Sequence, residues 1–123
     1  MKLLVTGGRA FRDFRTLTAD LDSLHKDTPI ALLIHGGAPG ADSLAGLWAE
    51  VHNVPTAVYR AQWNLHGKAA GPIRNQQMLD VARPEAYLDF PGGRGTADMV
   101  HRLQEAGIPR ALPPKNSPQF LTP

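Results

Sequence analysis

Short apolar runs alternate along the chain with longer segments in which apolar residues recur every three or four positions. Short continuous runs are typical of strands buried on both faces, and the wider spacing is typical of one buried helix face. The predicted strands are residues 2–6, 30–34, 55–59, 87–90 and 108–112. The predicted helices are residues 14–25, 41–52, 72–82 and 97–106. This alternation predicts an α/β fold: a single Rossmann-like, doubly wound domain with a mostly parallel five-stranded sheet and helices on both faces.

Several positions give more local expectations. Asp13 is expected to cap the first helix, and Gly107 follows the last helix as its C-terminal cap. Pro109 indicates that the last strand lies at an edge of the sheet. The expected core stripe of the second helix is Leu44, Leu47, Trp48 and Val51.

The least regular part of the chain is residues 60–71, which we predict to be a loop with a helical turn lying over the site. We place the domain at residues 1–112 and a proline-rich C-terminal tail at residues 113–123. Phe120 and Leu121 are the residues through which the tail would pack.

Composition narrows the class of protein. The chain has 123 residues, which is enough for one domain, and 42% of them are hydrophobic. No apolar run approaches twenty residues, so we expect no membrane span. There is no cysteine, and a cytoplasmic location fits best. The net charge is +2, from 13 basic and 11 acidic residues, without a run of like charges, so a nucleic-acid partner is not indicated.

Three apolar runs end in a Gly-Gly pair followed by the start of a helix, in residues 3–9, 31–42 and 87–100. Glycine lets the backbone approach a ligand closely, and the first N–H groups of a helix attract anions. Thr96 is placed either to cap its helix or to donate its hydroxyl to a phosphate. Because the turns would meet at the carboxyl edge of a parallel sheet, they predict an anion-binding pocket there.

The candidate ligand-binding residues all lie in or beside these turns or on the helix before the last strand. They are Gly7, Gly8, Arg9, His35, Gly36, Gly37, Gly40, Arg74, Asn75, Pro91, Gly92, Gly93, Arg94, Gly95 and Thr96. Each has an alternative interpretation. The glycine turns can serve packing alone, and the arginines can be solvated surface charges. His35 can be a satisfied core histidine, and Arg74 can pair with Asp80 or a helix end.

The sequence shows no metal-binding pattern and neither of the common nucleotide-binding motifs. The histidines have no metal-ligand spacing with one another or with a carboxylate, so we predict no metal. The P-loop motif is absent, the dinucleotide fingerprint is absent from the first turn, and we predict no cofactor. Trp63, in the irregular segment, either stacks on a base or anchors its loop.

Four motifs, in this order, resemble the SLOG superfamily, and most of all its YspA-like branch, the DUF2493 group. They are residues 6–9, 35–42, 71–78 and 90–96. The resemblance covers about residues 1–112. It implies a Rossmann-like domain that binds a nucleotide or nucleotide-derived ligand and forms a homo-oligomer, a dimer or higher. DNA-processing protein A shares the superfamily, which leaves a DNA-handling role as a third hypothesis.

An enzyme branch of this superfamily, the LOG phosphoribohydrolases, splits the N-glycosidic bond of nucleoside 5′-monophosphates. Its motif is Pro-Gly-Gly-x-Gly-Thr-x-x-Glu, with an arginine on the preceding helix. Arg74 falls at that arginine, but Met99 occupies the glutamate position. Glycosidic cleavage needs a carboxylate, which a methionine cannot replace. The resemblance therefore leaves two hypotheses: a binding module or sensor, or a hydrolase in which Arg74 acts with Asp42 or Asp98.

The two carboxylates differ in position. Asp98 is one residue before Met99, which is a rotation of about 100° on a helix, so its side chain need not face the same way. Asp42 lies at the start of a helix and at the mouth of a glycine turn. It is placed to bond ribose hydroxyls, or it is only a partner for the helix dipole.

Overall fold

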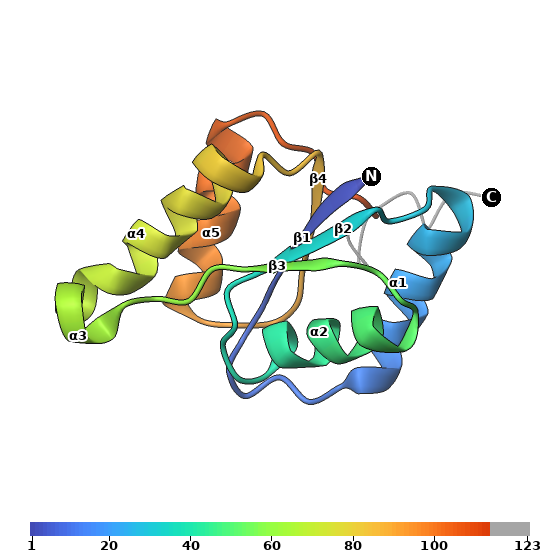
Figure 1. Cartoon of the computed structure of the whole chain (residues 1–123), viewed down its shortest axis with the longest axis horizontal. Helices are drawn as coiled ribbons and strands as arrows, with labels where there is room; N and C mark the ends of the chain where they lie inside the picture. Colours follow the sequence, from blue (N-terminus) through green and yellow to red (C-terminus); the bar gives the residue numbers. More distant parts are fainter. Residues whose placement is uncertain (114–123) are drawn as a thin grey trace.

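A four-stranded, all-parallel sheet in the order β3-β2-β1-β4 forms the centre of the molecule (Figure 1). The computed structural model describes residues 1–113. The strands are β1 (Lys2–Thr6), β2 (Leu32–His35), β3 (Thr56–Val58) and β4 (Ala86–Asp89). Leu4 of the central strand β1 is opposite Ile34 on one side and Tyr87 on the other. All four strands therefore end at the same edge of the sheet.

Helices cover both faces of this sheet, α1 and α2 on one side and α4 and α5 on the other (Figure 1). The α-helices are α1 (Phe14–Asp27), α2 (Ala41–Val51), α3 (Trp63–His66), α4 (Ala70–Gln77) and α5 (Arg94–Glu105). A short 3-10 helix η1 (Gly67–Ala69) precedes α4, and a π-helical segment η2 (Met78–Ala82) continues it. The architecture is the Rossmann-like α/β fold that the alternation of patterns predicts.

Two hydrophobic cores lie on opposite faces of the sheet because successive strand residues point to opposite sides. Leu3 and Val5 pack with the residues of α1 and α2, whereas Leu4 between them packs with Met99 and Leu103 of α5. All of these side chains are fully buried. This double burial explains why β1 and β2 read as continuous apolar runs.

The predicted fifth strand, residues 108–112, is wrong. Only one isolated parallel bridge forms there, between Arg110 and Tyr87. Tyr87 N–H donates to the carbonyl of Pro109, and Ala111 N–H donates to the carbonyl of Tyr87. Arg110 also pairs with Asp89, with 2.6 Å between Nε and Oδ1. Proline cannot extend a ladder of backbone bonds because it has no N–H, and this ion pair holds the chain at the bridge.

The predicted core stripe of α2 is also wrong for two of its residues. Leu47 is 47% exposed and Val51 is 68% exposed, whereas Trp48 is buried and Leu44 is partly buried. The helix contacts the sheet through small residues instead: Ala41, Ala45 and Ala49. Alanines at this spacing let α2 lie close to the strands, and Leu47 and Val51 then face outward.

The ends of the helices are mostly as expected. Asp13 caps α1 by accepting a bond from the N–H of Thr16 at 3.0 Å, and Gly107 follows α5 with a φ of +77°. The exception is the start of α5, because Gly93 occupies its N-cap and no side chain caps it. Thr96 is therefore inside the helix and does not cap it.

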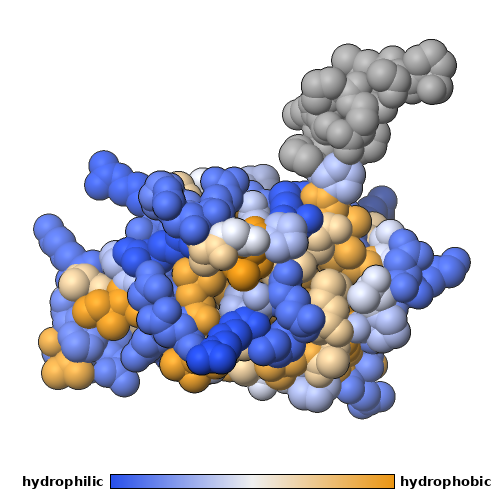
Figure 2. Space-filling model, turned by 90° about the horizontal axis from the view of Figure 1, so that it is seen from above, coloured by the Kyte–Doolittle hydropathy of each residue, from blue (hydrophilic) through white to orange (hydrophobic). Residues whose placement is uncertain are grey.

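The remaining expectations concern the surface and the tail. No helix within residues 1–113 is long and apolar enough to cross a membrane. Seen from above, hydrophobic residues are interspersed among hydrophilic ones on the face shown in Figure 2. Except for Pro113, the predicted tail, with Phe120 and Leu121, lies outside the described residues.

Candidate functional site

The glycine-rich loops after β1 and β4 interlock at the carboxyl edge of the sheet. Gly8 N–H donates to the carbonyl of Pro91 at 2.9 Å. A Cβ on Gly8 would lie 2.7 Å from that carbonyl oxygen, and a Cβ on Gly92 would lie 2.7 Å from the nitrogen of Gly8 and would overlap Thr96 Oγ1. Gly8 and Gly92 are therefore required because the two backbones touch.

The glycine turn after β2 is closed by its own contacts. Asp42 Oδ2 accepts the N–H groups of Gly36 at 3.0 Å and Ala38 at 3.2 Å. The first N–H of α2, at Ala41, donates to the carbonyl of Gly8. Gly40, with φ +81°, packs against the same loop. This turn supports the loop after β1 and does not present a free anion-binding cradle.

His35 belongs to this support and not to the cavity. Its Nδ1 accepts the N–H of Gly37 at 3.0 Å, and its Nε2 lies over Gly46 of α2. Burial, and then the charge of Arg60, lower the pKa of His35 below its ordinary value. A neutral, buried ring fits the interpretation of His35 as a satisfied core histidine.

A cavity of about 680 Å³ lies between the loops after β1 and β4 and the helix α4. Most of the predicted site residues line it: Gly7, Gly8, Arg9, Asp42, Arg74, Asn75, Pro91, Gly92, Gly93, Arg94, Gly95 and Thr96. His35, Gly36, Gly37 and Gly40 do not line it. Phe11 and Ala38 do, although neither was predicted, and their one sequence signal was proximity to a glycine turn.

The first turn of α5 faces this cavity. Its N–H groups at Arg94, Gly95 and Thr96 have no partner within the helix, because the first N–H groups of any helix lack one. A Cβ built on Gly93 or Gly95 would meet no atom within 4 Å. Packing therefore does not require glycine at these two positions, and the space beside them is open to a ligand. An anion at this place would gain the N–H groups and the helix dipole.

Arginines supply positive charge around the same space. Arg9 and Arg94 line the cavity from the loop after β1 and the start of α5. Arg74 reaches it from α4, where Nη1 donates to the carbonyl of Gly36 at 2.8 Å and Nε donates to Asn75 Oδ1 at 3.0 Å. Burial lowers the pKa of Arg74, but a guanidinium remains a cation.

Asp42 is the only carboxylate that lines the cavity within residues 1–113. Burial raises the pKa of Asp42 above its ordinary value, although two backbone N–H groups and the charges of Arg74 and Arg9 oppose this. Both backbone bonds go to Oδ2, so Oδ1 accepts no hydrogen bond within the described chain. Asp42, a largely buried residue, thus offers one carboxylate oxygen next to a guanidinium.

Asp98 lies outside the cavity and holds α5 against α4. It accepts Asn75 Nδ2 at 2.9 Å and Arg102 Nε at 2.8 Å. Partial burial raises the pKa of Asp98, but the hydrogen bonds from Arg102 and Asn75 outweigh it, so the pKa lies below its ordinary value. Asn75 also donates to the carbonyl of Gly95 at 3.3 Å, which links Arg74 to the first turn of α5.

Met99 is a core residue. It is fully buried and packs in the cluster of Leu4, Ile34 and Leu103 beneath α5. The structure therefore points this position into the apolar core. Within residues 1–113, no three His, Cys, Asp or Glu side chains come together in a way that could hold a metal ion.

Comparison with known proteins places the chain in a family. The sequence profile YAcAr, described as the YspA, cpYpsA-related SLOG family, matches residues 1–66, from β1 through α3. The chain is also 40% identical over 116 residues to the Gene 61 protein of Mycobacterium phage D29, an alignment that covers 88% of this chain and 92% of that protein. With the glycine turns and the parallel sheet in place, the chain belongs to the YspA, cpYpsA-related SLOG family.

Proposed function

We propose that this protein binds a nucleotide or nucleotide-derived ligand and acts as a sensor or binding module. The observation that carries the proposal is the cavity, which is lined by the open first turn of α5, including Arg94, together with Arg9 and Arg74. Membership of a SLOG family supports this class of ligand.

The phosphate belongs at the start of α5. Gly93 and Gly95 leave room for it, and the N–H groups of this turn and the Arg94 side chain complement its charge. Asp42 Oδ1 is then placed to accept bonds from ribose hydroxyls, because a carboxylate next to a phosphate itself would be repelled.

Binding without turnover fits the surroundings of Met99, which stands at the glutamate position of the hydrolase motif, and of the neighbouring Asp98. Met99 is buried in the core, and Asp98 lies outside the cavity and is occupied by Arg102 and Asn75. Neither can approach a glycosidic bond in the cavity without rearrangement of α5.

One observation favours hydrolysis as a second candidate: Asp42 is buried, carries a raised pKa and lies in the cavity beside Arg74. In such a reaction, water adds its hydroxyl to C1′ of the ribose, and the base leaves with the proton. Asp42 would stabilise the oxocarbenium-like state or take the proton of the attacking water.

The test incubates the purified protein with nucleoside mono-, di- and triphosphates, NAD and ADP-ribose. Retained ligand and released base are both followed by liquid chromatography with mass detection. Binding without turnover predicts a retained, intact nucleotide. Released base would support hydrolysis, provided that Asp42→Asn abolishes it and Asp98→Asn, outside the cavity, does not. If the protein neither retains a nucleotide nor releases a base, the proposal is contradicted.

Assembly and location remain proposals. We propose a homo-oligomer on the resemblance alone, and light scattering during size-exclusion chromatography tests it. A monomeric mass at micromolar concentration would contradict it. A cytoplasmic location and the absence of a nucleic-acid partner also stay predictions.

A further inference from the structure

Trp63 is a large aromatic residue that packing does not explain. It is 48% exposed, and α3, which carries it, contains no buried residue. The other tryptophan, Trp48, is 1% exposed. Because α3 contributes nothing to either core, Trp63 is not a core anchor for the irregular segment.

The ring nevertheless has a defined position. The guanidinium carbon of Arg9 lies 5.5 Å from the centroid of the Trp63 ring. Trp63 also meets the start of α4, where a Cβ on Gly71 would lie 3.5 Å from Cη2. Arg9 of the loop after β1 and Gly71 of α4 thus both lie next to the ring of Trp63.

Arg9 joins this place to the cavity. It lines the cavity, and its charge is felt at both Asp42 and Arg74. Trp63 therefore stands at the rim, next to the arginine that borders the interior. An exposed indole and a planar guanidinium are both surfaces on which nucleobases stack.

We propose that Trp63 and Arg9 form the subsite for the planar aromatic base of the ligand. This rests on the proposed function, in which the phosphate lies at the start of α5. The base then stacks at the rim against Trp63 and the flat face of Arg9. The ligand class is narrowed accordingly, from any sugar phosphate to one that carries an aromatic heterocycle.

The test compares two probes that differ only in the base. Adenosine 5′-monophosphate and ribose 5-phosphate are titrated by calorimetry into the wild type, Trp63→Ala, Trp63→Phe and Leu65→Ala. Leu65 is the matched control because it lies on the same short helix and is 70% exposed. We expect Trp63→Ala to weaken binding of the monophosphate by about fivefold to 150-fold, the range that stacking supplies per base. The affinity of Trp63→Ala for ribose 5-phosphate should equal that of the wild type. Trp63→Phe should lose less affinity for the monophosphate than Trp63→Ala, and Leu65→Ala should lose none.

Fluorescence provides a second readout. Bound adenosine 5′-monophosphate should quench the emission of the exposed Trp63 in the wild type. It should leave the emission of Trp63→Phe unchanged, because only the buried Trp48 emits there.

The outcomes separate this inference from the proposed function. If the wild type binds both probes and Trp63→Ala weakens both equally or neither, the base subsite is overturned and the phosphate site stands. If the wild type binds the monophosphate without a change in tryptophan emission, the base subsite is likewise overturned. If neither these probes nor any nucleotide of the panel above binds the wild type, the proposed function is overturned, and the base subsite with it.

Discussion

Two adjacent glycines in the turn before α5 have different roles. Gly92 touches Thr96 and the backbone of Gly8, whereas a Cβ on Gly93 would meet nothing within 4 Å. The same residue type thus serves packing at one position and leaves open space at the next. The sequence cannot separate these roles, because the backbone that Gly92 meets, at Gly8, is more than eighty residues away in the chain.

This difference predicts the effect of two alanine substitutions. Gly92→Ala forces a methyl group into Thr96 and Gly8, so it should lower the free energy of unfolding by about 1–3 kcal/mol. Gly93→Ala should lower it by less, about 0.5–1 kcal/mol, because alanine is a weaker N-cap than glycine but its methyl group meets no other atom. Urea denaturation followed by circular dichroism measures both. Equal losses would show that the two loops do not interlock as described.

Asp42 should make stability fall with rising pH. Its pKa in the folded protein is raised, so between its ordinary value and the raised value the native state binds a proton that the unfolded state has lost. Stability from this group is therefore complete at low pH and decreases as the pH rises through that window.

Asp42→Asn removes the ionisation and keeps an oxygen that can accept the N–H groups of Gly36 and Ala38. The wild type should lose stability relative to Asp42→Asn as the pH rises above the ordinary pKa of an aspartate and through the raised pKa of Asp42. Urea denaturation at several pH values measures the difference. A difference that is constant with pH would contradict a raised pKa at Asp42.

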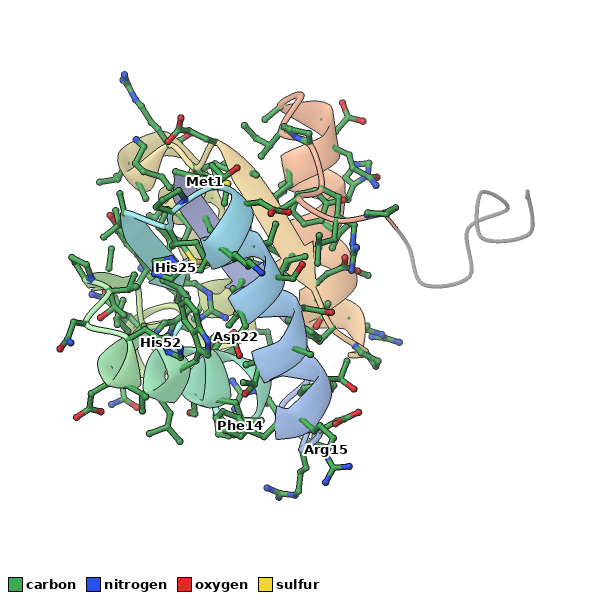
Figure 3. The ribbon with its side chains drawn as sticks, turned by 90° about the vertical axis from the view of Figure 1, so that its right-hand side faces the viewer. Met1, Phe14, Arg15, Asp22, His25 and His52 are labelled. Atoms are coloured by element: carbon green, nitrogen blue, oxygen red, sulfur yellow. The ribbon has the colours of Figure 1, made fainter. Side chains whose placement is uncertain are left out.

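At the scale of elements, α1 and α2 are joined by two polar contacts of Asp22 within an aromatic cluster. Asp22 of α1 accepts Trp48 Nε1 at 2.8 Å and lies 3.2 Å from His52 Nε2. The ring of His52 stacks on Trp48 at 4.3 Å, and His25 meets Trp48 edge-on at 5.4 Å. Asp22, His25 and His52 can be followed in Figure 3, which looks onto these two helices.

Removing the carboxylate should weaken this pairing of helices. Asp22→Ala leaves the N–H of Trp48, itself a buried residue, without its acceptor, which costs about 1–3 kcal/mol. Thermal and urea denaturation measure the loss, with the exposed Glu50→Gln on α2 as control. If Asp22→Ala costs no more when Trp48 is present than in a Trp48→Phe background, the bond contributes nothing.

The elements themselves were largely predictable because apolar patterning reports burial. The four strands and the helix cap at Asp13 are confirmed. The stripe of α2 was wrong because alanine, which makes the contact, gives a weak signal beside Leu47 and Val51. The start of α5 was placed three residues late, because Gly95 in its first turn is a poor helix former.

At the scale of the whole molecule, the position of the site followed from topology. Parallel strands that alternate with helices bring their following loops to one edge, so the glycine turns predicted a cavity there. Topology alone did not predict which glycine turn lines the cavity and which one only supports it. The turn after β2 closes on Asp42 and on the loop after β1, and Arg74 donates to Gly36 from another element. These long-range contacts have no local pattern.

Calorimetric titration of nucleotides into Gly93→Asp tests the central claim most directly, with Gly93→Asn as the matched control. Both residues are favourable at a helix N-cap, so both variants should fold. They have nearly the same shape, but only aspartate places a negative charge where the phosphate is proposed to lie. The account predicts that Gly93→Asp binds at least about tenfold more weakly than Gly93→Asn. Equal affinities in the two variants would contradict a phosphate site at the start of α5.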